Sequence, residues 1–249
     1  MNVRKTLSLS ILIIVATVPC VPAAFSADEL TFKQVAKASK TYFRDSAEFP
    51  LRISVEMTAT DLSRRVRKHK TGKFKYDFHG YNQRSGNATG MLYGPKGMFK
   101  AARGIAISSL APMALLSLDV EKDYTFTLAE PVEPGLLSAR LAPIPDCPTF
   151  QWLADAYGPK SLCGSFQIQM QADDLALKHL VFDAVGLPVA ANIDFLGPAT
   201  LSSYHVEAEF QKVFLPGDPK PFLVPKLIVV TVETDKGKLV ITSNYAPRK

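Results

Sequence analysis

Residues 203–213 read SYHVEAEFQKV, and apolar and polar side chains alternate along almost the whole stretch. Tyr204, Val206, Ala208 and Phe210 fall on one side of an extended chain, and polar or charged residues separate them. Successive side chains of a β-strand point to opposite faces, so this pattern predicts a strand with one buried face. It favours an antiparallel sheet that packs on one side only.

The flanking segments repeat the pattern. Before this stretch, SFQIQMQ places Phe166, Ile168 and Met170 on one face, and Asp173-Asp174 predicts a turn into a second strand, LALKHLVF. A further strand is expected over 189–195. After it, LIVVTVET and KLVITSNY flank a short turn that contains a glycine, which is typical of a hairpin. The C-terminal half therefore predicts a run of antiparallel strands.

The N-terminal half mixes helix and strand patterns. An amphipathic helix is expected over 28–45, a half-buried strand over 51–57 and an antiparallel meander over 63–104. Two more short helices are expected, over 104–118 and 150–157. The glycines at positions 72, 80, 86, 90, 94 and 97 are interpreted as successive turns of the meander. With at least eight strands and about three helices, the fold class is predicted to be α+β, dominated by one strongly curved antiparallel sheet.

The first residues have the plan of a secretory signal peptide. Arg4 and Lys5 precede an apolar centre at 7–18, which is too short for a comfortable membrane span. Small residues before the first acids predict cleavage after Ser26. Cys20 raises the alternative of a lipid-modified N-terminus, but the residues before it do not have the usual pattern. The expected product is an exported, soluble protein with a single domain over residues 27–249.

Charge makes nucleic acid a poor partner. Removal of residues 1–26 takes away two basic residues and no acid, so the formal net charge falls from +6 to +4. One basic run stands out, and it has two interpretations: a solvated strand or loop, or a contact with anionic lipid head groups or an acidic protein. It contains Arg64, Arg65, Arg67, Lys68, Lys70 and Lys73.

Little in the sequence predicts covalent chemistry. The GxSxG, HExxH and GxGxxG motifs are absent, and the four histidines are scattered. We therefore expect no enzyme, no cofactor and no metal site. In an oxidising compartment, Cys147 and Cys163 are expected to form a structural disulfide, which would contribute about 3 kcal/mol.

Residues 163–245 resemble the LolA-like, LolB-like and RseB-like group of bacterial envelope proteins. The segments that carry the resemblance are GSFQIQMQADDLALKHLVF, YHVEAEFQKVFLPGDPKPFLVPK and KGKLVITSNY. The resemblance implies an incomplete β-barrel whose concave face, covered by a few short helices, binds acyl chains of lipids or lipoproteins. It implies a lid helix over 110–118, and a cavity lined by Phe166, Ile168, Met170, Tyr204, Val206, Phe210, Leu110 and Leu115.

This chain departs from the lipoprotein carriers in its greater length and in its cysteine pair. The resemblance therefore implies a periplasmic protein that shelters a lipid, an acyl chain or another apolar ligand, rather than lipoprotein transport itself. Two alternatives stay open. The apolar face could form an ordinary dry core with a small pocket, or the protein could be an envelope interaction or sensing module without a small ligand.

The segment FLPGDPKPFLVPK, residues 214–226, has four prolines between two expected strands. Proline restricts the backbone and removes a hydrogen-bond donor, so we expect a stiffened connection that also protects a sheet edge. Phe222 and Leu223 are expected on this connection, at the rim of the concave face.

Overall fold

The computed structural model describes residues 30–42, 51–60, 71–82, 87–93, 124–145, 164–193, 196–214, 217 and 219–247. These residues form one helix, α1 (Phe32–Tyr42), and eleven strands. The first five strands are β1 (Leu51–Thr60), β2 (Thr71–Asn82), β3 (Asn87–Tyr93), β4 (Tyr124–Ala129) and β5 (Leu136–Pro143). The others are β6 (Gly164–Gln171), β7 (Leu177–Ala184), β8 (Val189–Ile193), β9 (Gly197–Val213), β10 (Phe222–Thr234) and β11 (Gly237–Pro247).

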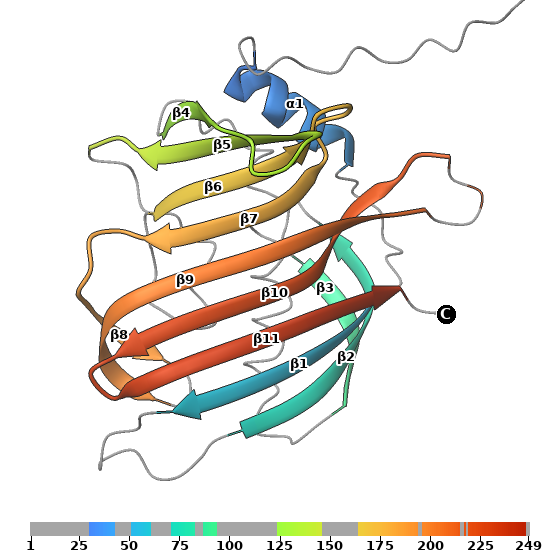
Figure 1. Ribbon diagram of the computed structural model, residues 1–249. Helices are drawn as coiled ribbons and strands as arrows, with labels where there is room; N and C mark the ends of the chain where they lie inside the picture. The colour runs from blue at the N-terminus through green and yellow to red at the C-terminus, as the bar shows by residue number, and fades with distance from the viewer. Residues whose placement is uncertain are drawn as a thin grey trace, which may run out of the picture.

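All the strands belong to a single antiparallel sheet. Its order is β3-β2-β1-β11-β10-β9-β7-β6-β5-β4, and β8 pairs with β9 beside this path. The sheet curves strongly, so that β2 and β3 turn behind β10 and β11, and it stays open between β3 and β4 (Figure 1). The predicted fold class, an α+β protein built on a strongly curved, incomplete antiparallel barrel, is confirmed.

The alternation of the sequence decides which side of each strand is buried. In β6, Phe166, Ile168 and Met170 are buried, while the residues between them are partly or fully exposed. The same holds for β9, where Val206 pairs with Phe182 of β7 on one side and with Val230 of β10 on the other. We call the face that carries these buried side chains the inner face, and the opposite face the outer face.

Helix α1 begins with a capping box that the sequence analysis missed. The Gln34 backbone N–H donates to Thr31 Oγ1 at 3.3 Å, and the Thr31 N–H donates to Gln34 Oε1 at 2.7 Å. The helix buries one apolar stripe, and Phe32 contacts Phe126 of β4 with ring centroids 6.0 Å apart. The predicted N-terminal helix is confirmed over Phe32–Tyr42. Among the described residues, no helix is long and apolar enough to cross a membrane.

Three of the glycines predicted as turns lie in strands instead. Gly72 and Gly80 belong to β2, and Gly90 belongs to β3. Gly80 adjoins a register shift in the β2–β3 ladder, after Phe78. A glycine in a strand often marks such a bulge rather than a turn, so the prediction of turns at these positions is wrong.

The proline-rich connection is shorter than predicted. β10 begins at Phe222, so Pro225 lies in a strand and pairs with Phe210 of β9. The β10–β11 ladder starts only at Leu227. Pro225 thus lies in a part of β10 that pairs with β9 alone among the described strands, where a missing donor is tolerated. The helices predicted over 104–118 and 150–157 lie outside the described residues.

Candidate functional site

The inner face brings together the strand residues predicted to line a cavity. All of them belong to one hydrophobic core cluster, and none is more than 4% exposed. They come from two strands, β6 and β9, which are not adjacent because β7 lies between them. The residues are Phe166, Ile168, Met170, Tyr204, Val206 and Phe210.

A row of aromatic rings crosses this face from β4 to β9. Tyr124 and Phe166 have ring centroids 5.7 Å apart, Phe166 and Phe182 are 4.9 Å apart, and Phe182 and Tyr204 meet edge to face at 6.5 Å. Tilted and edge-to-face contacts are the favoured geometries of such pairs. Burial raises the pKa of Tyr204, so its phenol stays neutral. The row forms a continuous apolar wall.

The sequence analysis missed several residues of the inner face. In β7 the apolar residues fall at Leu177 and then at Leu180 and Phe182, so the period of two is interrupted. The cause is a bulge: Gln169 pairs with His179, while Met170 pairs with Leu177, which leaves an extra residue in β7. After such an insertion, side chains on the same face are no longer separated by a regular period of two, so a simple alternation rule does not identify them. Leu180, Phe182, Ile228, Val232 and Ile241 are among the fully buried residues that were missed.

A polar link joins α1, the β6–β7 turn and the end of β9. Lys212 Nζ donates to Asp174 Oδ2 at 2.5 Å, and the Ala176 N–H donates to Asp174 Oδ1 at 3.0 Å. Asp174 also accepts a hydrogen bond from the Tyr42 hydroxyl. Burial would raise the pKa of Asp174, but the bonds from Lys212, Tyr42 and Ala176 outweigh it and lower the pKa. Burial, followed by the bond to Asp174, raises the pKa of Tyr42.

The other predicted site residues have different outcomes. Leu223 is buried and, with Phe210, lines a pocket at the end of the β9–β10 hairpin. Phe222 and Lys73 lie in strands, but their side chains are not among those described. The remaining predicted residues lie outside the described residues, and they are Leu110, Leu115, Cys147, Cys163, Arg64, Arg65, Arg67, Lys68 and Lys70.

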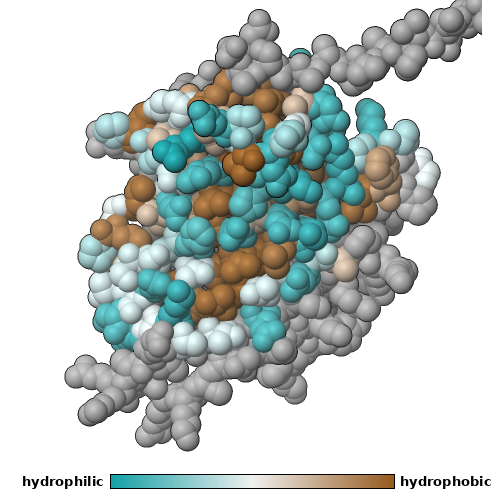
Figure 2. Space-filling model, in the orientation of Figure 1, coloured by the Kyte–Doolittle hydropathy of each residue, from teal (hydrophilic) through white to brown (hydrophobic). Residues whose placement is uncertain are grey.

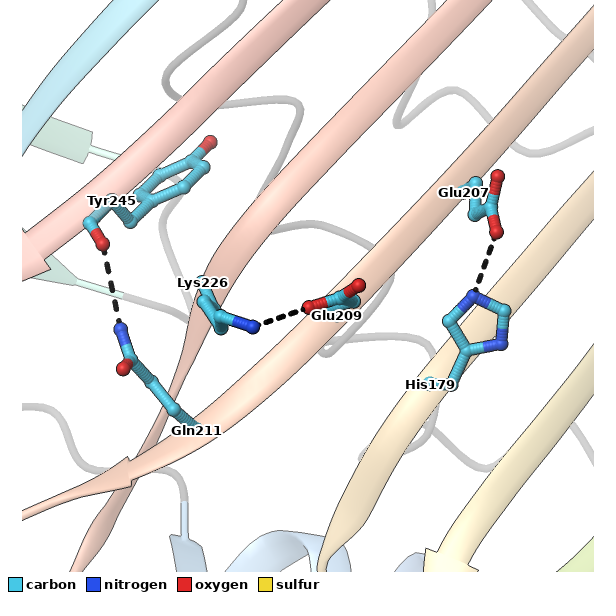
Figure 3. A network of polar contacts seen from close by, with 6 residues as sticks. All are labelled: His179, Glu207, Glu209, Gln211, Lys226 and Tyr245. Atoms are coloured by element: carbon cyan, nitrogen blue, oxygen red, sulfur yellow. Dashed lines mark hydrogen bonds and ion pairs between the residues drawn. The ribbon is translucent and has the colours of Figure 1, made fainter.

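The outer face is mixed in character. Hydrophilic side chains cover much of it, with smaller apolar areas between them (Figure 2). Three contacts join its strands (Figure 3): His179 Nε2 to Glu207 Oε1 at 3.1 Å, Lys226 Nζ to Glu209 Oε2 at 2.8 Å, and Gln211 Nε2 to the Tyr245 carbonyl at 3.4 Å. The hydrogen bond from Lys226 lowers the pKa of Glu209. These contacts are typical of a solvated sheet face.

A second histidine on the outer face also meets a carboxylate. His205 Nδ1 lies 2.7 Å from Asp183 Oδ1 on the neighbouring strand. A catalytic role for this pair would need a nucleophile or a substrate beside it. Within the described part of the chain, no group of three or more histidine, cysteine, aspartate or glutamate residues could hold a metal ion.

These features define a class of protein: an open, curved antiparallel half-barrel with an apolar inner face and a helix at one end. No family model and no curated protein matches the chain. Among solved structures, a LolA superfamily protein from Nitrosomonas europaea matches over 87% of this chain and 92% of its own, with a TM-score of 0.38 and 10% sequence identity. This is the superfamily that residues 163–245 resemble. A likeness of this degree does not transfer a function.

Proposed function

We propose that the protein is a non-catalytic binding protein of the bacterial periplasm that shelters a lipid, an acyl chain of a lipoprotein or another apolar ligand against its inner face. The observation that carries this proposal is the extent of the apolar surface. Buried apolar side chains run from Tyr124 in β4 to Tyr245 in β11 and form one cluster. A surface of this kind must be covered, either by protein or by an apolar ligand.

The described helix is small compared with this surface. An α-helix of 11 residues is about 16 Å long, whereas ten strands at about 4.8 Å span about 43 Å along the curve. The side chains of α1 meet β4 through Phe32 and the β6–β7 turn through Tyr42. Its contacts therefore favour the β4–β7 end. The inner side chains of β9–β11, such as Val206 and Ile241, are buried as well, so an apolar ligand would lie against them by displacing the groups that bury them.

In this proposal affinity comes from burial of apolar surface, at about 25 cal/mol per Å². No cofactor, metal or nucleic acid takes part. The protein is exported after removal of residues 1–26, and Cys147 and Cys163 form a disulfide in the oxidising periplasm. The partners are lipid or lipoprotein acyl chains, with the basic segment from Arg64 to Lys73 contacting an anionic membrane surface or an envelope protein.

The alternative function is an envelope interaction or sensing module without a small ligand. The open sheet favours it, because β3 and β4 form the two ends of the order of the described strands. An edge strand presents unpaired backbone groups to which another chain can add a strand. In β4, Thr125 and Thr127 are exposed.

Native mass spectrometry and lipid extraction of the protein purified from its own host test the proposal directly. We expect a co-purifying lipid, and saturable uptake of a fluorescent fatty acid by the stripped protein. Absence of both results would rule out the carrier function and favour the interaction module.

A matched pair of variants locates the ligand. Val206 is buried on the inner face, and Val229 is half-buried on the outer face of the neighbouring strand. We expect Val206→Phe to weaken uptake about tenfold by filling the space the ligand needs, and Val229→Phe to change it less than about twofold. Equal effects of the two substitutions in folded variants would contradict binding at the inner face.

A further inference from the structure

A pocket lies where the sheet splits between β7 and the β9–β10 hairpin. The β7–β9 ladder ends at His179 and Glu209, but β9 continues to Val213, paired with β10. The hairpin thus extends past the start of β7 (Figure 1). A pocket of about 330 Å³ occupies this split, and we call it the seam pocket. Its lining consists of Gln171, Ala176, Leu177, Lys178, Phe210, Gln211, Lys212, Leu223 and Lys226.

Two lysines of the seam pocket are bulge residues. In the β6–β7 ladder, the register shift leaves Lys178 as the extra residue of β7. In the β9–β10 ladder, Pro225 pairs with Phe210 and Leu227 with Glu209, which leaves Lys226 as the extra residue of β10. Bulges redirect side chains and are enriched beside functional sites. Here both of them place a lysine at the same pocket, from opposite sides of the split.

The turn beside the pocket contains an unusual backbone conformation. Leu175 has a φ of 57° although it is not a glycine, and its side chain is 1% exposed. A left-handed leucine is strained, and such residues cluster at functional sites. The turn is fixed by two bonds of the polar link, from Lys212 and the Ala176 N–H to Asp174. Ala176 and Lys212 both line the pocket.

The lining combines an apolar half with a cationic half. Leu177, Phe210 and Leu223 are buried apolar residues, and Lys178, Lys212 and Lys226 line the same pocket. Lys212 donates to Asp174 and Lys226 to Glu209, but an ammonium group has three donors, so each retains donors for a ligand. The lining itself contains three lysines and no carboxylate, and the carboxylates of Asp174 and Glu209 that bind two of these lysines are not part of it.

We propose that the seam pocket binds a short amphiphile with an anionic head group, either a carboxylate or a phosphate. The lysines bind the head group, and the apolar half takes the first carbons of the chain. At about 30 Å³ for a water-sized group, the pocket holds about eleven non-hydrogen atoms, the size of an eight-carbon fatty acid. The seam pocket shares Phe210 and Leu223 with the predicted inner-face lining, but it lies at the split between β7 and the β9–β10 hairpin. Binding of a ligand there does not depend on the proposed carrier function.

Titration calorimetry with octanoate, octyl phosphate, octanol and acetate tests the proposal, with methyl NMR of Leu177 and Leu223 to locate the ligand. We expect saturable binding of octanoate or octyl phosphate, with shifts at these two leucines, and the tighter of the two identifies the head group. Equal binding of octanol would overturn the anionic preference, and equal binding of acetate would overturn the need for a chain. Shifts at Ile168 and Val206 instead would assign the ligand to the inner face and reject the seam pocket.

The double variant Lys178→Gln/Lys226→Gln tests the bulge lysines. We expect it to weaken binding of the anionic probe about tenfold, because two charge-assisted hydrogen bonds are lost. Lys178→Gln alone, which leaves the Lys226–Glu209 pair intact, is expected to give part of this loss. The control is Lys238→Gln, which removes a lysine paired with Glu233 elsewhere in the sheet. Unchanged binding in the double variant, or an equal loss in the control, would overturn the proposal.

Discussion

At the scale of single residues, Gly164 shows how closely the inner face is packed. A Cβ atom at this position would collide with the ring of Phe182 and lie 2.5 Å from the Asp183 carbonyl oxygen. Phe182 is 0% exposed and lies between Phe166 and Tyr204, so its ring cannot move aside. We expect Gly164→Ala to lower the free energy of unfolding by about 1 to 3 kcal/mol, measured by urea denaturation.

The control for this prediction is Ser165→Ala, one position further along β6 on the outer face. Its free energy of unfolding should stay within about 0.5 kcal/mol of the parent protein, as is usual for surface substitutions. If Gly164→Ala were as stable as this control, the packing of Phe182 against β6 would be looser than described.

Asp174 gives the second prediction at this scale. Its pKa is lowered in the folded protein, so its contribution to stability is complete above the pKa of the unfolded chain and is lost as pH falls through the folded pKa. We expect Asp174→Asn to cost about 1 kcal/mol at pH 7, because the bonds from Lys212 and Tyr42 lose their charged acceptor. Below about pH 4 the difference from the parent protein should shrink.

Urea denaturation at a series of pH values between neutral and strongly acid checks this prediction. Asp173→Asn is the matched control, since Asp173 is the neighbouring acid of the same turn and is exposed. Parallel pH curves for the parent protein and Asp174→Asn would mean that the polar link does not stabilise the fold.

At the scale of elements, the sequence predicts strands well where alternation is unbroken. β6 and the second half of β9 have a strict period of two, and both their extents and their buried faces were predicted. β7 was predicted as a strand, but its inner residues Leu180 and Phe182 were missed, because the bulge at Lys178 shifts the parity. The glycines of β2 and β3 were misread because a glycine serves both turns and bulges. Local pattern cannot distinguish an insertion in a ladder from a change of element.

The polar link and the seam pocket could not have been predicted for a different reason. Asp174 and Lys212 are 38 positions apart in the chain. They meet because β7 pairs with the second half of β9 while β8 pairs with the first half, so the β6–β7 turn lies beside the end of β9. β7 and β8 thus pair with the same edge of β9, which is 17 residues long. That arrangement follows from the order of the strands in the sheet, which a local sequence pattern does not predict.

At the scale of the whole molecule, an open half-barrel has one apolar face to protect and, among the described strands, two end strands, β3 and β4. A ligand that binds only the folded protein adds to its stability by mass action, and at about 100 times its Kd the gain is about 2.7 kcal/mol. For a domain of this size we expect a fatty acid at that concentration to raise the thermal midpoint by about 5 to 10 °C. Differential scanning fluorimetry of stripped and loaded protein measures this shift.

The same measurement distinguishes the inner face from the seam pocket, because the two proposed sites bind ligands of different chain length. A long-chain fatty acid should raise the midpoint in the parent protein and in Lys178→Gln/Lys226→Gln, but much less in Val206→Phe, since its chain lies against the inner face. Octanoate should show the opposite pattern, with the loss in the double lysine variant. If neither the long-chain fatty acid nor octanoate raises the thermal midpoint, both proposed binding sites are contradicted. The end strands β3 and β4 would then be the functional surface, because an interaction module needs no small ligand to complete its fold.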